Sequence, residues 1–556
     1  MFGAGSGNVV FTGAVGGATN GALGTITNIA SQQLTFSDAV TATTIANYGT
    51  LLFNATSAKT ISPAITDLGT TTIQVINSAD GAPGIITFSG NVAADTITIG
   101  STVRAGSALF NGTVIQGTTT NINIVGGSAS DENSLANFAN TVTVTAITLD
   151  DRTGTASTTF SGASKIITGT INGLATTEGT ITVSGTPTFV STIGNSQRPA
   201  QLTINGATTF QAAVQTAALT TTAAISNGTT LNVSGASSIG ANITTSGTQT
   251  YTGAVTLTAA STLTTTSNGN ISFGAAISGS GQNLTLDTGL TSGTISVTGA
   301  VGSGAALGTL TISKSAGTTF SSTVNAATIA LTDSKVSTAV TFNGNVTATT
   351  GLTVGAGTAA YNVIFNGASN TIAGATTFAN TGTLTLGNGG DTIAFTGGII
   401  ATAPSQVNIG GTVQSTDSTI SIGDSGTPIV LTADSTISAG SGAITLGGTV
   451  DGAFALTLNS TGTTTLSGVI GTTALTSLTT NAGGTLAINT TAITTTGAQS
   501  YGENVTLGAD VTLTTTSNGN ISFGGTITNA SAQNLTLDTG LTSGTISVTG
   551  AVGSGT

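Results

Sequence analysis

The side chains that could carry out acid–base chemistry are few, and they stand in two short clusters. Asp131 and Glu132 are adjacent, and Asp150 and Asp151 come directly before Arg152. Paired carboxyl groups at a suitable separation can hydrolyse glycosidic bonds. Adjacent residues of an extended chain, however, point to opposite faces, so neither pair converges on one substrate atom. We therefore predict that both clusters are solvated loops, and polysaccharide cleavage by a β-helix enzyme is kept only as a remote alternative.

The sequence has even fewer of the residues that nucleophilic catalysis requires. The 556 residues contain no His and no Cys, which supply the base or the thiolate of the common nucleophilic sites. A Ser–Lys pair would need one of the four lysines, and none lies in a recognisable signature: Lys59, Lys165, Lys314 and Lys335. The Gly-rich segments lack the Lys of a phosphate-binding loop. We predict no catalytic residue and no cofactor, and a protein that is not an enzyme.

One segment is similar to a calcium-binding repeat. Residues 387–395 read GNGGDTIAF, which is the pattern of a Gly-rich nonapeptide whose Asp binds the ion. Asp391 is therefore the candidate metal ligand. Such sites are built from consecutive copies, and this chain has a single one, so a plain glycine-rich turn without metal is the favoured interpretation.

The composition places the chain in the all-β class. Only 5% of its residues are charged, against about 25% in ordinary domains. Hydrophobic residues make up 38%, and mean hydropathy is +0.37, which argues against disorder. Apolar residues alternate with Thr and Ser, as in TVTVTAITL at 141–149, and β-branched residues favour strands. The four tyrosines are expected to be half-buried strand residues: Tyr48, Tyr251, Tyr361 and Tyr501.

Charge and hydropathy exclude two kinds of partner. The net charge is −12, whereas nucleic-acid binding requires basic stripes. No run of about 18 apolar residues occurs, so no membrane-spanning helix is predicted.

Internal repeats are the strongest signal in the sequence. LTTTSNGNISFG at 263–274 recurs unchanged at 513–524, and residues 282–304 recur at 533–555. Together they form a duplication of 243–304 as 493–555. Looser modules start near residues 13, 193, 299, 468 and 550. Because the sequence begins and stops inside this pattern, we expect it to be a piece of a longer polypeptide.

A shorter period predicts the architecture. Phe recurs in one context, an apolar residue before it and a small residue and Gly after it, as in LFNGTV at 109–114. Several of these Phe residues are 22 apart: 88 and 110, 138 and 160, 320 and 342. Twenty-two residues are too few for a sandwich domain and fit one coil of a parallel β-helix with three short strands. We predict one continuous β-solenoid over residues 1–556, with coils of about 22 residues and irregular rungs.

The modules also resemble a known group of proteins. TFSSTV at 319–324 with GAVG and ALGTLT before it, and residues 494–525, are similar to the repeats of filamentous-haemagglutinin-like exoproteins, autotransporter passengers and large surface proteins of rickettsia-type bacteria. The resemblance implies an extracellular or bacterial cell-surface location and an adhesive, structural fibre that contacts surface or matrix glycans and proteins. The alternative is a subunit that assembles with copies of itself into a surface layer, sheath or filament. No receptor motif such as Arg-Gly-Asp is present to carry over.

Overall fold

The computed structural model describes residues 8–17, 21–77, 84–529, 531–540 and 542–553. Every regular element among these residues is a β-strand, and none is a helix. The chain forms a parallel β-solenoid of about 24 turns with coils roughly 22 residues apart, which confirms the predicted fold class. It divides into two compact units, residues 1–269 and 270–556, which are described separately. That the two units make one uninterrupted solenoid stays a prediction.

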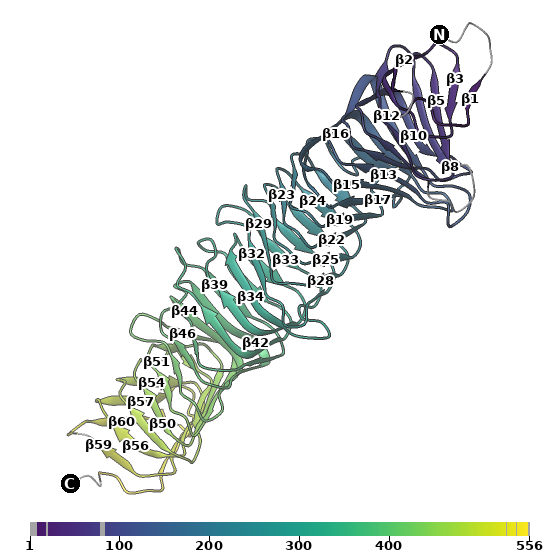
Figure 1. The fold of residues 1–556 in the computed structure, drawn as a ribbon. Helices are drawn as coiled ribbons and strands as arrows, with labels where there is room; N and C mark the ends of the chain where they lie inside the picture. Colours follow the sequence, from purple (N-terminus) through teal and green to yellow (C-terminus); the bar gives the residue numbers. More distant parts are fainter. Residues whose placement is uncertain (1–7, 18–20, 78–83, 530, 541, 554–556) are drawn as a thin grey trace. The chain divides into compact units, whose positions relative to one another are not determined.

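Unit 1 has three columns of parallel strands, and each coil adds one strand or a single bridging residue to each column (Figure 1). The first column contains β1 (Val9–Phe11), β3 (Gln33–Phe36), β5 (Thr50–Ala55), β8 (Thr72–Asn77), β21 (Val214–Thr216), β24 (Leu231–Val233) and β27 (Gln249–Tyr251). The second contains β2 (Leu23–Asn28), β4 (Ala42–Asn47), β7 (Ala64–Asp67), β18 (Thr186–Phe189), β20 (Thr208–Phe210), β23 (Ile225–Asn227), β26 (Ile243–Thr245) and β29 (Ser261–Thr265). The third contains β6 (Lys59–Ile61), β9 (Ile85–Phe88), β11 (Ser107–Phe110), β13 (Ser134–Phe138), β15 (Ala156–Phe160), β17 (Thr180–Val183), β19 (Gln201–Ile204), β22 (Ala218–Thr221), β25 (Ser237–Ile239) and β28 (Val255–Leu257).

Four longer strands of unit 1 run from the second column into the first across a register shift: β10 (Val92–Gly100), β12 (Val114–Val125), β14 (Val142–Asp150) and β16 (Ala163–Gly173). A bulge at the corner lets one strand serve two sides of the coil, because the extra residues turn the chain without ending the pairing.

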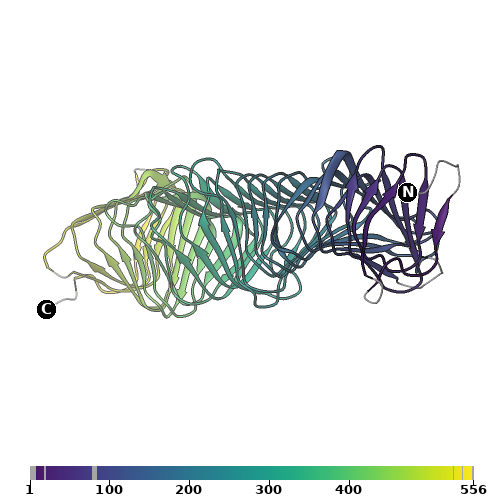
Figure 2. The same ribbon diagram turned by 45° about the horizontal axis from the view of Figure 1, so that its top comes forward.

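Unit 2 repeats the three-column plan, and Figure 2 shows the coils within each unit lying one on the next. Its first column contains β30 (Ile271–Phe273), β33 (Ile295–Val297), β35 (Thr318–Phe320), β37 (Ala339–Phe342), β39 (Asn362–Phe365), β48 (Val450–Asp451), β51 (Ile470–Leu475), β54 (Ala492–Thr495), β57 (Val511–Thr515) and β60 (Leu535–Asp538). The second contains β31 (Ile277–Ser278), β40 (Ser369–Ile372), β49 (Ala455–Ser460), β52 (Ser477–Thr480), β55 (Gln499–Tyr501), β58 (Ile521–Phe523) and β61 (Ile546–Val548). The third contains β32 (Leu284–Asp287), β34 (Leu307–Lys314), β41 (Thr376–Thr377), β43 (Ile399–Ala401), β45 (Ile420–Ile422), β47 (Ile444–Leu446), β50 (Thr463–Leu466), β53 (Thr485–Ile488), β56 (Asn504–Leu507) and β59 (Ile527–Asn529).

Five longer strands of unit 2 span two columns: β36 (Val324–Leu331), β38 (Val346–Val354), β42 (Thr383–Phe395), β44 (Gln406–Gln414) and β46 (Ile429–Gly440).

The alternation of apolar and hydroxyl residues fixes which side chains enter the core. In β26 the side chains of Ile243 and Thr245 are buried and Thr244 between them points outward, as the period of two in a strand requires. Coil length varies around this constant unit. The Cα partner of Phe88 is Phe110, whereas that of Phe210 is Asn227, which closes a shorter coil. The irregular rungs expected from the sequence are therefore turns of different length between strands that keep their register.

A stack of phenylalanine rings runs through the core of unit 1. Neighbouring ring centroids are 5.0–5.6 Å apart along the whole series: Phe11, Phe36, Phe53, Phe88, Phe110, Phe138, Phe160, Phe189 and Phe210. Within a column the rings are nearly parallel, at 8° for Phe88 and Phe110. Where the stack passes to the next column the rings meet edge to face, at 88° for Phe53–Phe88 and 86° for Phe160–Phe189. Both arrangements are favourable for aromatic pairs.

The glycine that follows Phe in the sequence motif is required by close contact between coils. A Cβ built on Gly112 would lie 2.1 Å from the carbonyl oxygen of Gly90 in the preceding coil. Gly162, which follows Phe160, repeats this on the carbonyl oxygen of Ala139, at 2.5 Å. These residues do not have positive φ, so the requirement is for space at the corner and not for a left-handed backbone.

The variant Gly112→Ala should lower the free energy of unfolding by roughly 1–3 kcal/mol, because its methyl group forces two backbones apart. Gly13 has the same place in its own motif, FTGAV, and a Cβ there would meet nothing within 4 Å. Gly13→Ala is thus the matched control and should leave stability nearly unchanged. Chemical denaturation of both variants measures the difference, and equal midpoints would show that the corner has room.

Candidate functional site

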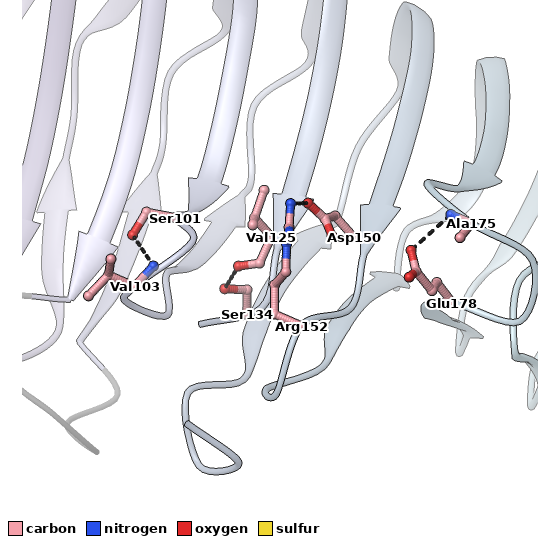
Figure 3. A network of polar contacts seen from close by, with 8 residues as sticks. All are labelled: Ser101, Val103, Val125, Ser134, Asp150, Arg152, Ala175 and Glu178. Atoms are coloured by element: carbon pink, nitrogen blue, oxygen red, sulfur yellow. Dashed lines mark hydrogen bonds and ion pairs between the residues drawn. The ribbon is translucent and has the colours of Figure 1, made fainter. Parts of the chain in front are cut away.

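The acidic clusters belong to unit 1, and Figure 3 shows Asp150 and Arg152 of the second one. The prediction that both are solvated loops is wrong for Glu132, which is 2% exposed, and for Asp150, which is 8% exposed. Asp131 is exposed, as predicted. The reason is that Glu132 reaches the coil before it, where its Oε2 accepts a hydrogen bond from the backbone N–H of Ala105.

The second cluster is engaged in the same way. Oδ2 of Asp150 accepts a hydrogen bond from Nη2 of Arg152 at 2.7 Å, an ion pair drawn in Figure 3. Asp151 accepts two backbone N–H groups, from Ala156 at 2.6 Å and from Gly179 in the next coil at 2.8 Å. Asp151 therefore completes the backbone hydrogen bonding of the wall, whereas Asp150 is held by its ion pair with Arg152.

Asp151→Asn should destabilise the protein by about 1–3 kcal/mol, because one carboxylate oxygen becomes an NH2 group that faces an N–H donor. The same substitution at the exposed Asp131 changes the charge equally without disturbing a buried amide, and should have little effect. Thermal or urea unfolding compares the two variants. Equal stability losses would mean that Asp151 is not a structural acceptor.

Asp391 accepts a hydrogen bond from a backbone amide three residues before it in the chain. It is 6% exposed within β42, and its Oδ2 accepts the N–H of Asn388 at 2.8 Å. Gly387, Gly389 and Gly390 have positive φ, which shapes the glycine-rich turn that the sequence favoured. Within the described part of the chain, no three His, Cys, Asp or Glu side chains gather as a metal site would need.

Among the described residues, no hydrogen bond joins a lysine side chain to a serine hydroxyl group, as a Ser–Lys pair would require. Lys59 forms an ion pair with Asp38 at 2.8 Å. This ion pair and a hydrogen bond from the backbone N–H of Ala39 both lower the pKa of Asp38. Nζ of Lys335 donates to the carbonyl oxygen of Thr291 at 2.8 Å. Lys165 is partly exposed on β16, and Lys314 is exposed on β34.

Three of the four tyrosines are buried more deeply than predicted. Tyr251, Tyr361 and Tyr501 are at most 1% exposed, whereas Tyr48 is 39% exposed. Their hydroxyl groups stay in the core because each donates inside it: Tyr251 to Oε1 of Gln249 at 2.9 Å and Tyr361 to the carbonyl oxygen of Gly355 at 2.7 Å. Burial raises the pKa of all three. The prediction of half-burial is wrong for these three residues, because each side chain points into the core.

The duplicated segments build the same core network. Nε2 of Gln249 donates to the carbonyl oxygens of Ile243 (3.2 Å) and Thr264 (2.9 Å). Gln499, its counterpart in the second copy, donates to those of Ile493 and Thr514 at the same distances. A buried amide between strands is thus reproduced where the sequence is reproduced.

The copies differ at one buried carboxyl group. Glu503 stands where the first copy has Gly253, and it is 2% exposed. Oγ1 of Thr480 donates to its Oε2, while Oε1 is buried without a hydrogen-bond partner. Burial raises the pKa of this carboxyl group, and the Thr480 hydrogen bond opposes the rise.

A raised pKa means that folding favours protonated Glu503, so its contribution to stability is greatest in acid. The free energy of unfolding should fall as the pH rises above the ordinary Glu value of about 4.3. Glu503→Gln cannot ionise and should show a smaller fall between pH 4 and 7, measured by denaturant unfolding at several pH values. An unchanged pH slope in the variant would contradict the assignment.

Outward ladders of hydroxyl groups are the surface feature that motif analysis did not find. On the third column of unit 1 the outward middle positions are Thr60, Thr87, Leu109, Asn137, Thr159, Thr182, Thr203, Thr220, Ser238 and Thr256. On the third column of unit 2 they are Thr377, Ile400, Ser421, Thr445, Thr465, Ala487, Thr506 and Thr528. The signal in the sequence was Thr or Ser at the centre of most of the short apolar strands.

A depression in unit 2 lies on the start of its hydroxyl ladder. It is lined by Thr377, Ile400 and Ser421 of the ladder, with Asp417 and Thr419 beside them. Ile400 is 46% exposed, so an apolar patch sits among hydroxyl groups and one carboxylate. Such a surface can offer hydrogen bonds and a hydrophobic contact to a sugar ring.

The fold and these surfaces define the class: a parallel β-solenoid protein with hydroxyl-rich outer faces. Comparisons with protein-family models, curated proteins and solved structures give no match. Among the described residues there is no helix of the length and hydropathy that crossing a membrane requires.

Proposed function

We propose that this chain is an adhesive, structural fibre segment of an extracellular bacterial surface protein and that it carries out no catalysis. The observation that carries the proposal is the hydroxyl ladder, one Thr or Ser on most coils of a column. Its groups repeat at the strand spacing of about 4.8 Å, which suits repeated weak contacts to glycans or to matrix proteins.

The use of the acidic side chains supports the absence of catalysis. Glu132 and Asp151 accept backbone amides, and Asp150 is paired with Arg152. A glycosidase needs one carboxyl group free to donate its proton and a second free to activate water or attack. Of the acids that the sequence offered for this role, three are engaged in these contacts, and the fourth, Asp131, is an exposed residue. The bacterial surface location is supported by the resemblance of the repeats.

The test is binding of the full chain to a glycan array and to immobilised matrix proteins. The variant T377V/T419V/T445V removes three hydroxyl groups in and beside the depression, and Val keeps the β-branched shape. It should weaken binding about tenfold or more. The comparison variant T182V/T203V/T220V makes the same change on the ladder of unit 1, at residues that do not line the depression, and should weaken binding less, because the depression still holds the ligand. Binding to nothing, or equal binding by both variants, would contradict the proposed adhesive surface.

A further inference from the structure

Five consecutive turns of unit 1 join its first column of strands to its third. They are residues 101–106, 126–133, 151–155, 174–179 and 194–200, and the strands on both sides of them pair from coil to coil. All three arginines of the chain lie in these turns: Arg104, Arg152 and Arg198. In a chain with only 5% charged residues, charge is therefore concentrated at this corner.

The outward charges of the corner alternate in sign along the first four turns. Arg104 lies in the first turn, Asp131 in the second, Arg152 in the third and Glu178 in the fourth. Asp131 and Arg152 are exposed, and Arg104 and Glu178 are partly exposed. Because one coil follows the next at about 4.8 Å, these side chains form a ladder in which charge of one sign recurs every second coil.

Hydrogen bonds between neighbouring turns hold this ladder in place. The bonds that join each turn to the next run from the N–H of Ala105 to Oε2 of Glu132, from that of Gly154 to the carbonyl oxygen of Gly127 at 3.0 Å, and from that of Gly179 to Oδ2 of Asp151 at 2.8 Å. The outward charges thus stand on a fixed platform, which loses little conformational entropy when a partner binds.

Two exposed apolar side chains lie on the same turns. Val103, in the first turn, is 60% exposed, and Leu174, in the fourth, is 54% exposed. Figure 3 shows Val103, Arg152 and Glu178 along this edge of the coils. Three coils separate Val103 from Leu174, a distance of roughly 14 Å. Apolar side chains beside charged ones are the composition of a protein interface, in which the apolar groups are buried and the charged groups surround them.

We propose that this corner binds the same corner of a second copy of the chain. The two copies lie antiparallel, about a two-fold axis between the second and third turns. The first turn of one copy then meets the fourth turn of the other. Val103 packs on Leu174 of the second copy, and Arg104 pairs with its Glu178. The inference does not rest on the proposed adhesive function.

The same axis also matches the two inner turns. Asp131 of the second turn faces Arg152 in the third turn of the other copy. Two-fold symmetry makes every contact twice, so one corner supplies four ion pairs and two apolar contacts. The interface closes on itself, and its product is a dimer. Opposite charges placed in this way select the register of the two copies.

The apolar residues distinguish this register from another that also matches the charges. If one copy moves by two coils, Asp131 faces Arg198 of the other copy, and Arg152 faces its Glu178. That register places the first turn against the single residue Ala217, which joins the columns in a short coil. Val103 then has no apolar residue opposite it. Only the first register joins opposite charges and covers both exposed apolar side chains.

A charge swap between two full-length proteins tests the pairing of Asp131 with Arg152. In Asp131→Arg or Arg152→Glu alone, like charges face each other twice, which should weaken dimerisation at least about tenfold. The mixture should restore it, because the new arginine of one protein faces the new glutamate of the other and both unchanged residues still pair. Sedimentation at low salt over a series of concentrations measures the dimer. Lys165→Glu, a charge reversal on β16, is the control and should dimerise as the unmodified chain does.

Two results would overturn the proposal: an unmodified chain that stays monomeric, or a mixture no more dimeric than its components. A second pair of variants avoids any change at the Asp150–Arg152 ion pair. Val103→Asp buries an unpaired charge in the interface and should weaken dimerisation at least about tenfold. Val336, in unit 2, is 52% exposed, and Val336→Asp should dimerise normally. Equal dimerisation by these two variants would overturn the apolar contact.

Cysteine cross-linking tests the antiparallel arrangement, since the chain has no Cys of its own. Val103→Cys and Leu174→Cys, mixed as separate full-length proteins under mild oxidation, should form a disulfide-linked dimer. Val103→Cys alone is the control, because its two cysteines would lie three coils apart. The mixed pair should react at least about fivefold faster, given the short Cα separation that a disulfide spans. Faster cross-linking of Val103→Cys with itself would overturn the antiparallel register.

Discussion

The backbone hydrogen bonding between successive coils is the constraint on which the rest of the structure depends. Because each strand must lie about 4.8 Å from the next, every side chain stands directly against its counterpart one coil away. The phenylalanine rings stack at 5.0–5.6 Å in unit 1 for this reason. At the corners the same spacing leaves no room for a Cβ, as between Gly112 and Gly90.

Polar side chains complete the hydrogen bonding where the backbone ladder is interrupted. Oδ1 of Asn133 accepts the N–H of Thr155 in the next coil at 2.8 Å, and Oδ1 of Asp417 accepts that of Ser441 at 2.8 Å. The bonds from Ser441 lower the pKa of Asp417. The same arrangement recurs at Asn270, Asn345 and Asn504. These hydrogen bonds lie at exposed turns, where Asn and Asp recur because their short side chains readily accept hydrogen bonds from backbone amides.

The duplicated segment separates the effect of sequence from that of position. Leu284 and Leu286 are fully buried, whereas the identical Leu535 and Leu537 are only partly buried. The strands form in both places, since β32 and β60 have the same bounds relative to their sequences. Burial, in contrast, is contributed by the coil that lies on top. In a solenoid the stability of each repeat depends on its neighbours for this reason.

The sequence by itself determined the fold class, because alternation of apolar and β-branched residues and the regular Phe spacing are local properties of the chain. It also identified the glycine-rich turn around Asp391. Only the tertiary structure decided that Glu132, Asp150 and three of the tyrosines are buried. Neighbouring coils supply the backbone amide that Glu132 accepts and the residues that pack over these side chains. Coil length was likewise decided by which strands pair: Phe210 with Asn227 in a short coil, and Phe110 with Phe138 in a long one. Turn length carries no periodic signal, so register between coils is decided by the packing of whole coils on one another.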